Sequence, residues 1–247
     1  MGINNTPQTS FASRLGEDTI TLFVGPDRQK FTVHKKLICT LPYFRAAFEG
    51  GFVERNGKMD LPEEKPEMMA LFVGWIYQGK IESIYTQSHV NNLFYLCIFA
   101  EKICEVRLMD MTIDAIQDIS LACNAKLEPK TFFDVCQNTP VQSNITDFCI
   151  ALYAQQMTTV RIVQSDMKLA MSSLQELWKY VREDQSFFCC LMFGLNRHFH
   201  FRKKFDVDIR QRGEIPCTKL PTSCRWHTHE IAEKCPLDED GQAKEGK

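Results

Sequence analysis

Four side chains near the C-terminus have the types and the spacing of a metal site. Cys224, His227, His229 and Cys235 follow the pattern C-x2-H-x-H-x5-C, and Cys217 is an alternative ligand. Thiolates and imidazoles are the ligands that Zn²⁺ binds tetrahedrally in structural sites. The segment is short, so closing it around a metal costs little chain entropy. The pattern predicts one structural zinc ion, because four protein ligands leave no position for a substrate. The alternative is a polar tail with free thiols.

Catalytic motifs do not accompany these residues. The chain has no G-x-S-x-G, no P-loop, no H-E-x-x-H and no Rossmann glycine pattern. Its carboxylates are scattered, and the Cys189-Cys190 doublet lies in an apolar helical stretch where we expect inert thiols. We therefore expect a protein that is not an enzyme. A thiol or metal enzyme and a zinc-dependent nucleic-acid binder stay open as alternatives, with the second half of the chain carrying the activity.

The charge balance gives little support to a nucleic-acid partner. The chain has 29 Lys and Arg against 31 Asp and Glu, a net charge of −2, so it lacks a global basic field. The basic stretch RHFHFRKK at 197–204 is typical of a helix C-terminus, where positive charge is favourable. We expect no nucleic acid as a partner.

The cysteine count indicates a reducing compartment. The 11 cysteines are odd in number and lack the spacing of a disulfide framework, and the N-terminal stretch has no apolar signal-peptide core. We expect most of these thiols to be reduced and buried, in a cytoplasmic or nuclear protein. The longest apolar runs fall far short of the about 20 residues of a membrane helix, so no membrane partner is expected.

The first half begins with strand patterns and continues with helices. Alternating apolar residues at 20–24 and 30–34, joined by a turn-rich pentapeptide, predict a β-hairpin. Two short helical pieces at 35–40 and 42–49 follow, and 58–61 offers another short strand. From Pro66 the apolar residues recur at helical spacing.

Helical patterns continue through the rest of the chain. The helix that opens at Ser88 is apolar nearly all round, which indicates a position in the middle of its domain. The second half is predicted to be all helical, with a capping-box pattern at Ser173 and Glu176. An apolar stripe forms the last long helix: Phe187, Phe188, Leu191, Met192, Leu195 and Phe199.

Four stretches of the first half resemble a known family when taken in order. They are DTITLFVG, FTVHKKLICTLPYFRAAFEGGFVE, MDLPEEKPEMMALFVGWIYQGKI and LCIFAEKICEVRLMDMTIDAI. The Asp-led strand, V-H-K, the Gly-Gly-Phe loop, W-I-Y-x-G and A-E-K resemble the BTB/POZ domain. The chain is most similar to the fungal type, in which helices and a short Cys/His tail follow the domain.

The resemblance implies the fold and the division of the chain. The expected fold is an α/β (α+β) BTB/POZ domain at 18–127, a short, mostly antiparallel sheet capped by a helical cluster. An all-α region at 128–210 and a Cys/His-rich tail at 211–236, the possible zinc knuckle, follow. Segments 1–17 and 237–247 are expected to be disordered.

The resemblance also names the residues that meet partners. Related domains that recruit a cullin-type ubiquitin ligase scaffold use a hydrophobic-x-Glu element in the loop that holds Phe52 and Glu54 here, and Phe48 precedes it. The apolar side chain fills a pocket of the partner, and the carboxylate orients it at the rim. In the alternative, Phe52 packs within its own domain and Glu54 is only solvated.

We therefore expect a protein-interaction module. In its strongest form it is a self-associating adaptor that recruits an unidentified client protein to a cullin-type ubiquitin ligase. The alternative is a BTB scaffold or transcription-associated assembly factor without a ligase role. The oligomeric state stays open, because residues 1–17 lack the helix and strand that many dimeric BTB domains exchange.

Overall fold

The chain folds into two compact units, Met1–Glu82 and Ser83–Lys247. The computed structural model describes residues 15–140, 143–159, 164–204, 208, 210 and 226–228. The boundary predicted near residue 127 falls inside the second unit, in the segment between two of its helices.

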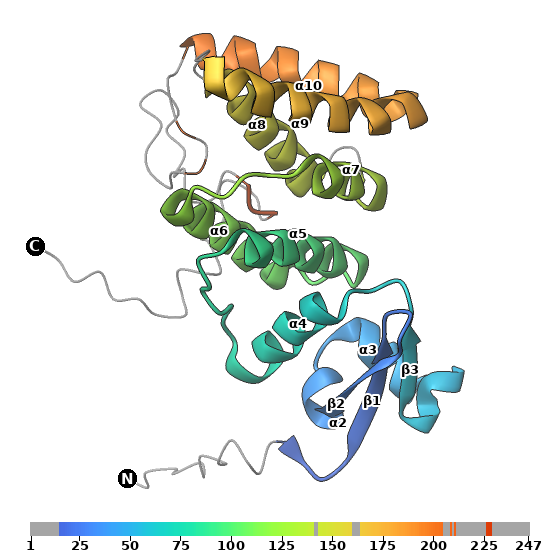
Figure 1. Ribbon diagram of the computed structural model, residues 1–247. Helices are drawn as coiled ribbons and strands as arrows, with labels where there is room; N and C mark the ends of the chain where they lie inside the picture. The colour runs from blue at the N-terminus through green and yellow to red at the C-terminus, as the bar shows by residue number, and fades with distance from the viewer. Residues whose placement is uncertain are drawn as a thin grey trace, which may run out of the picture. The chain divides into compact units, whose positions relative to one another are not determined.

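A small mixed sheet forms the start of the first unit (Figure 1). It consists of β1 (Thr19–Val24), β2 (Gln29–His34) and β3 (Lys58–Leu61) in the order β2-β1-β3. The hairpin and the third strand are therefore confirmed. The β1–β2 pair is antiparallel over six residue pairs and the β1–β3 pair is parallel over four, so the sheet is mixed with the antiparallel pairing the longer one. The parallel pairing arises because helices, instead of a tight turn, connect β2 to β3.

The described part of the first unit contains α2 (Lys35–Ile38), α3 (Pro42–Glu49) and α4 (Pro66–Gln78), and two of these helices, α3 and α4, contribute an aromatic cluster. Proline at the first position starts both α3 and α4, because its missing N–H would have no helical partner there. The cluster is made of stacked rings with centroids 5.6–6.3 Å apart: Phe44, Phe48, Phe72 and Trp75.

His34 connects β2 to α4. Its Nδ1 lies 2.6 Å from the Tyr77 hydroxyl, and its backbone N–H donates to the same oxygen at 3.1 Å. The Tyr77 hydroxyl of α4 thus contacts the chain at the point where β2 ends and α2 begins. These contacts give His34 a structural role at the junction of strand and helix.

The second unit begins with a pair of long helices that pack side by side, α5 (Gln87–Lys102) and α6 (Val106–Cys123). The Thr86 hydroxyl accepts the His89 N–H and caps α5. Helix α5 is buried on nearly all sides, as its sequence predicted: Val90, Leu93, Phe94, Leu96, Cys97 and Phe99. It ends at Lys102, and Cys104 just beyond it adopts a left-handed conformation with φ 56° and lies exposed.

Four further helices complete the described part of this unit: α7 (Pro129–Asn138), α8 (Asn144–Thr159), α9 (Gln164–Glu183) and α10 (Gln185–Lys204). Rings from three of them meet in its core, Phe132, Tyr153 and Phe187. The predicted capping box is wrong, because α9 begins at Gln164 and therefore carries Ser173 and Glu176 in its interior. Among the described residues, no helix is long and apolar enough to span a membrane.

The cysteines follow the prediction only in part. Cys39, Cys97 and Cys149 are buried free thiols, and burial raises the pKa of each. These three thiols are therefore protonated and poor nucleophiles at neutral pH. Cys104 and Cys189 are exposed, so the expectation that most thiols are buried does not hold for these two.

Tyr95 joins α5 to α7 and offers a test of this packing. Its hydroxyl donates to Asp134 Oδ2 at 2.7 Å, and Lys130 pairs with the same carboxylate. We predict that Tyr95→Phe lowers the free energy of unfolding by about 1–3 kcal/mol, the range for a hydrogen bond to a charged acceptor. Urea denaturation measures this change, with exposed Tyr85→Phe as the control. Equal losses in both variants would contradict the assignment.

Candidate protein-docking surface

Helix α3 fixes the surface that precedes the predicted interaction loop. Phe44 and Phe48 lie four residues apart and are both buried, so they hold one side of α3 against the core. Tyr43, Arg45 and Glu49 consequently face away from it. The outer side of α3 is therefore available to a partner while its inner side is packed.

Arg45 also stabilises the turn before α3. Its Nε donates to the Cys39 carbonyl at 3.1 Å, and its Nη2 donates to the Thr40 carbonyl at 3.1 Å. These bonds satisfy carbonyl groups at the end of α2 and fix the direction of the guanidinium. The positive charge beside α3 is thus held in place.

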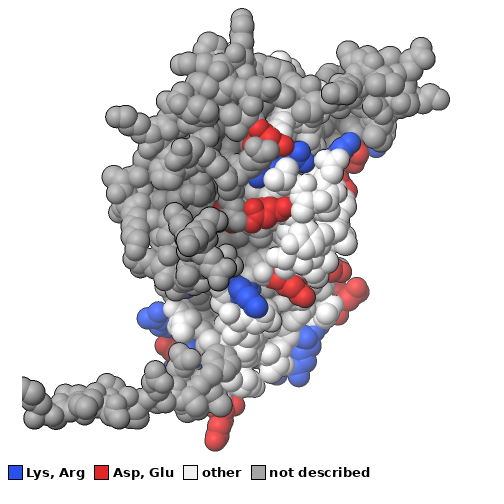
Figure 2. All heavy atoms as spheres, turned by 90° about the vertical axis from the view of Figure 1, so that its left-hand side faces the viewer, with Lys and Arg blue, Asp and Glu red and all other residues white. Residues whose placement is uncertain are grey.

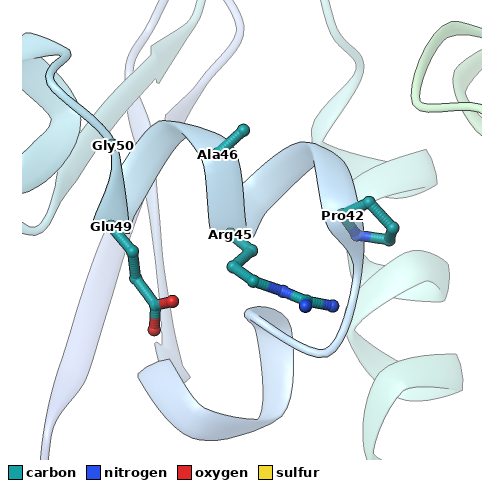
Figure 3. Close-up of a pocket in the computed structure, with 5 residues that line it drawn as sticks. All are labelled: Pro42, Arg45, Ala46, Glu49 and Gly50. Atoms are coloured by element: carbon teal, nitrogen blue, oxygen red, sulfur yellow. The ribbon is translucent and has the colours of Figure 1, made fainter.

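A shallow hollow of about 420 Å³ lies along this outer side (Figure 3). Its lining is Pro42, Arg45, Ala46, Glu49 and Gly50. The Arg45 guanidinium and the Glu49 carboxylate, one helical turn apart, border the hollow. Its floor consists of the small and apolar residues Pro42, Ala46 and Gly50. Such a hollow suits a partner side chain that is apolar with a polar end.

Gly50 ends α3 where the backbone is crowded. Its N–H donates to the Ala46 carbonyl at 3.0 Å and closes the last turn. A Cβ at this position would overlap that same carbonyl oxygen and would touch the Phe52 ring at 3.4 Å. Only glycine fits here without displacement of the backbone, so Gly50 sets the direction in which the chain leaves the helix.

The following loop presents two apolar side chains to solvent. Phe52 is 65% exposed and Val53 is 79% exposed. A 3-10 turn, η1 (Val53–Asn56), follows, and the Arg55 N–H donates to the Phe52 carbonyl at 3.2 Å. Glu54 is half-buried within this turn. The loop therefore holds an exposed aromatic side chain two residues before a carboxylate.

The structure places two of the three predicted interaction residues on the surface and one in the core. Phe52 and Glu54 lie on the surface loop, but Phe48 is 1% exposed and stacks on Phe44. Phe48 as a contact residue is therefore a wrong prediction, because its helical spacing from Phe44 turns it into the core. Its role is to support the surface from beneath. Arg45 and Glu49 were not predicted as contact residues, although their outward positions on α3 indicate them.

Three of the predicted zinc ligands, Cys224, His229 and Cys235, lie outside the described residues. His227 is described, and its Nε2 lies 3.0 Å from Asp114 Oδ1. A carboxylate beside one ring nitrogen is the arrangement that orients a metal-binding imidazole. His227 therefore fits a ligand role, and the zinc site stays a prediction.

A second exposed apolar surface lies on α10. Phe188, Cys189, Met192 and Phe193, which we call the α10 strip, share one side of the helix, and Phe193 is 74% exposed. Phe187, Leu191 and Leu195 face the core instead. The predicted apolar stripe is thus confirmed in part, since Phe188 and Met192 are exposed. No charged residue occurs from Gln185 to Asn196.

Charged side chains form no large field on the face shown in Figure 2. Lys and Arg alternate there with Asp and Glu among uncharged residues. On the described residues of this face, neither sign gathers into a patch of the kind that binds nucleic acid.

A comparison with protein families identifies the first half of the chain. Residues 14–120 match the model of the BTB/POZ domain. None of the curated proteins compared matches the chain. The three-stranded mixed sheet with its helices agrees with the family match.

The fold and its exposed loop thus define a protein–protein interaction module. The chain is a BTB/POZ domain-containing protein, with additional helices after the matched segment. The residues that could serve the interaction are those of α3 and the loop that follows it.

The two adjacent glycines provide a test of how this loop is held. Gly50→Ala places a Cβ against the Ala46 carbonyl, whereas a Cβ at Gly51 would have no neighbour within 4 Å. We predict that Gly50→Ala lowers the free energy of unfolding by about 1–3 kcal/mol, as overpacking does. Gly51→Ala should change it by less than about 0.5 kcal/mol. Thermal and urea unfolding measure both variants. Identical stability of the two would contradict the close approach at Gly50.

Proposed function

We propose that this protein is an adaptor that docks on a cullin-type ubiquitin ligase scaffold through the loop after α3. The observation that carries the proposal is the exposure of Phe52, 65%, two residues before Glu54. When a partner covers an aromatic side chain that is exposed to water in the free domain, the burial of its apolar surface stabilises the complex. Hydrogen bonds from the Gly50 N–H to the Ala46 carbonyl and from the Arg55 N–H to the Phe52 carbonyl restrain the chain on both sides of Phe52, so less loop entropy would be lost on binding.

The neighbouring residues support a division of roles within this surface. The Phe52 ring would enter an apolar pocket of the scaffold, and Val53 would widen the contact. Glu54 would orient the partner by accepting hydrogen bonds at the rim of the interface. The hollow along α3, with Arg45 and Glu49 at its border, would receive a side chain of the scaffold in return.

The α10 strip supports self-association as the second part of the proposal. A surface that joins two copies by twofold symmetry must complement itself. The α10 strip contains no charge that would repel its own copy, and its exposed side chains are aromatic or sulfur-containing. A dimer formed there would leave the loop after α3 to a different partner. The client, which remains unidentified, would then be brought to the ligase by a paired adaptor.

The α10 strip also supports a second candidate function. A BTB scaffold or transcription-associated assembly factor without a ligase role would need self-association but no cullin contact. Both candidates act without catalysis, in the cytoplasm or the nucleus. Recovery of cullin with the protein purified from native cells separates them, since only the adaptor retains it.

The cullin contact predicts a specific loss on mutation. Phe52→Ala should weaken binding of a cullin N-terminal fragment about 10- to 30-fold, as for a central interface anchor, and Phe52→Ala/Glu54→Ala should abolish its recovery in a pull-down. The matched controls are Tyr85→Ala, another exposed aromatic residue, and Glu63→Ala, another exposed acid. Both should bind as the wild type does. Equal recovery of cullin with all four variants would end the adaptor proposal.

Self-association predicts a change at a different place. Phe193→Asp puts a charge on the α10 strip and should shift the protein from dimer to monomer, because each copy would bury an unpaired carboxylate. Light scattering with size-exclusion chromatography measures the mass at several concentrations. Phe52→Ala is the control and should leave the mass unchanged. A wild-type protein that stays monomeric at high concentration would contradict the proposal.

A further inference from the structure

Helix α6 carries a carboxylate where an apolar residue would be expected. Asp110 is 1% exposed and lies between buried positions of the helix, Leu108, Met109 and Ile113. A buried carboxylate costs several kcal/mol unless hydrogen bonds satisfy its oxygens. The sequence periodicity of α6 gave no reason for an acid at this position. The explanation lies in the residues that approach Asp110.

A residue more than 100 positions away supplies two of these hydrogen bonds. The Thr228 backbone N–H donates to Asp110 Oδ1 at 2.9 Å, and the Thr228 hydroxyl lies 3.0 Å from the same oxygen. Two hydrogen bonds to one oxygen offset part of the cost of burying the group. Asp110 therefore holds one residue of the C-terminal segment by both its backbone and its side chain.

The two residues before Thr228 contact helices α6 and α8. His227 Nε2 lies 3.0 Å from Asp114 Oδ1, one turn along α6 from Asp110. The Asn144 side chain, at the start of α8, donates to the His227 carbonyl at 2.6 Å. Three consecutive residues thus meet polar and aromatic groups of α6 and α8 in order, since the Trp226 ring packs edge-to-face on Phe148 of α8.

A second contact ties the chain to the other end of α6. Arg210 donates to the Asn124 side chain at 3.2 Å and forms an ion pair with Asp208. Gln155 of α8 donates to Asp208 Oδ1 at 2.6 Å. Asn124 is the C-terminal cap of α6, where a cation is favourable. The chain after α10 therefore meets α6 at both ends of a stretch of about 20 Å, at 1.5 Å per residue.

We propose that α6 and α8 form a peptide-binding site, made by Asp110, Asp114, Asn144 and Phe148, whose ligand is the chain's own segment Trp226-His227-Thr228. The ligand class is an extended peptide with an aromatic residue, histidine and threonine in succession. Bound in cis, the segment acts as a clasp between α6 and α8. It thereby connects the helix in which the family match ends to the helices that follow. This site is distinct from the loop after α3 and does not depend on a cullin contact.

Emptying the site in the full-length chain tests the proposal. The variant Trp226→Ala/His227→Ala/Thr228→Ala keeps the helices and removes the internal ligand. A fluorescent peptide of residues 222–232, with Cys224 replaced by serine, should bind this variant at least tenfold more tightly than it binds the wild type. Fluorescence anisotropy in the presence of a chelator measures both affinities. Equal affinity, or no binding by the folded variant, would overturn the proposal.

The carboxylate itself provides a matched pair of substitutions. In the emptied variant, Asp110→Asn should reduce peptide affinity at least tenfold, because the amide of nearly the same shape replaces one of the two acceptor oxygens with a donor. Asp118→Asn, an exposed acid of the same helix, should leave the affinity unchanged. A peptide with alanine at the positions of Trp226 and Thr228 should not bind. Loss of affinity with Asp118→Asn equal to that with Asp110→Asn would contradict the assigned site.

Hydrogen exchange on the unmodified protein tests the clasp without any substitution. The Thr228 amide donates to Asp110, so it should exchange at least tenfold more slowly in the full chain than in the free 222–232 peptide. Mass spectrometry of peptic fragments that cover residue 228 gives the rate. Exchange at the rate of the free peptide would overturn the proposal even if the emptied variant does not fold.

Discussion

The burial of Phe44 and Phe48 is the interaction on which the docking surface depends. Phe44 stacks on both Phe48 and Phe72, and this packing fixes the rotation of α3 and turns its other side outward. At the C-cap of α3 the backbone passes so close to the Ala46 carbonyl that only glycine fits at Gly50. The exposed aromatic residue at Phe52 follows from this sequence of constraints. The core thus determines which side chains of α3 and of the following loop face the solvent.

The two compact units carry different kinds of surface. The first presents a short loop with an aromatic residue and a carboxylate, which suits recognition of one defined partner. The second presents the α10 strip and a site between α6 and α8 that the C-terminal segment fills. An adaptor needs several different surfaces, because the scaffold, a second copy and a client must be held at the same time. The buried thiols, whose pKa values are raised, agree with a role in packing.

The sequence allowed most of the fold to be predicted, because local patterns and the family motifs agreed. The hairpin, the proline-initiated helices and the strand at Lys58–Leu61 all follow from spacing that a single segment contains. The parallel pairing of β1 with β3 did not follow, since it depends on connections between segments. Phe52 and Glu54 were recognised from their motif, but Phe48 was misplaced, although its spacing of four residues from Phe44 puts both on the buried side of α3. Asp110 was missed because its partner, Thr228, is 118 residues away.

The most direct test of the account places a photo-reactive amino acid at Val53, between the two proposed contact residues, and irradiates native cells. Mass spectrometry then identifies what is attached, with the same amino acid at exposed Tyr85 as the control. The account predicts a covalent adduct with a cullin-type scaffold from position 53 and none from position 85. The absence of any polypeptide adduct at position 53, or the same adducts from both positions, would contradict it.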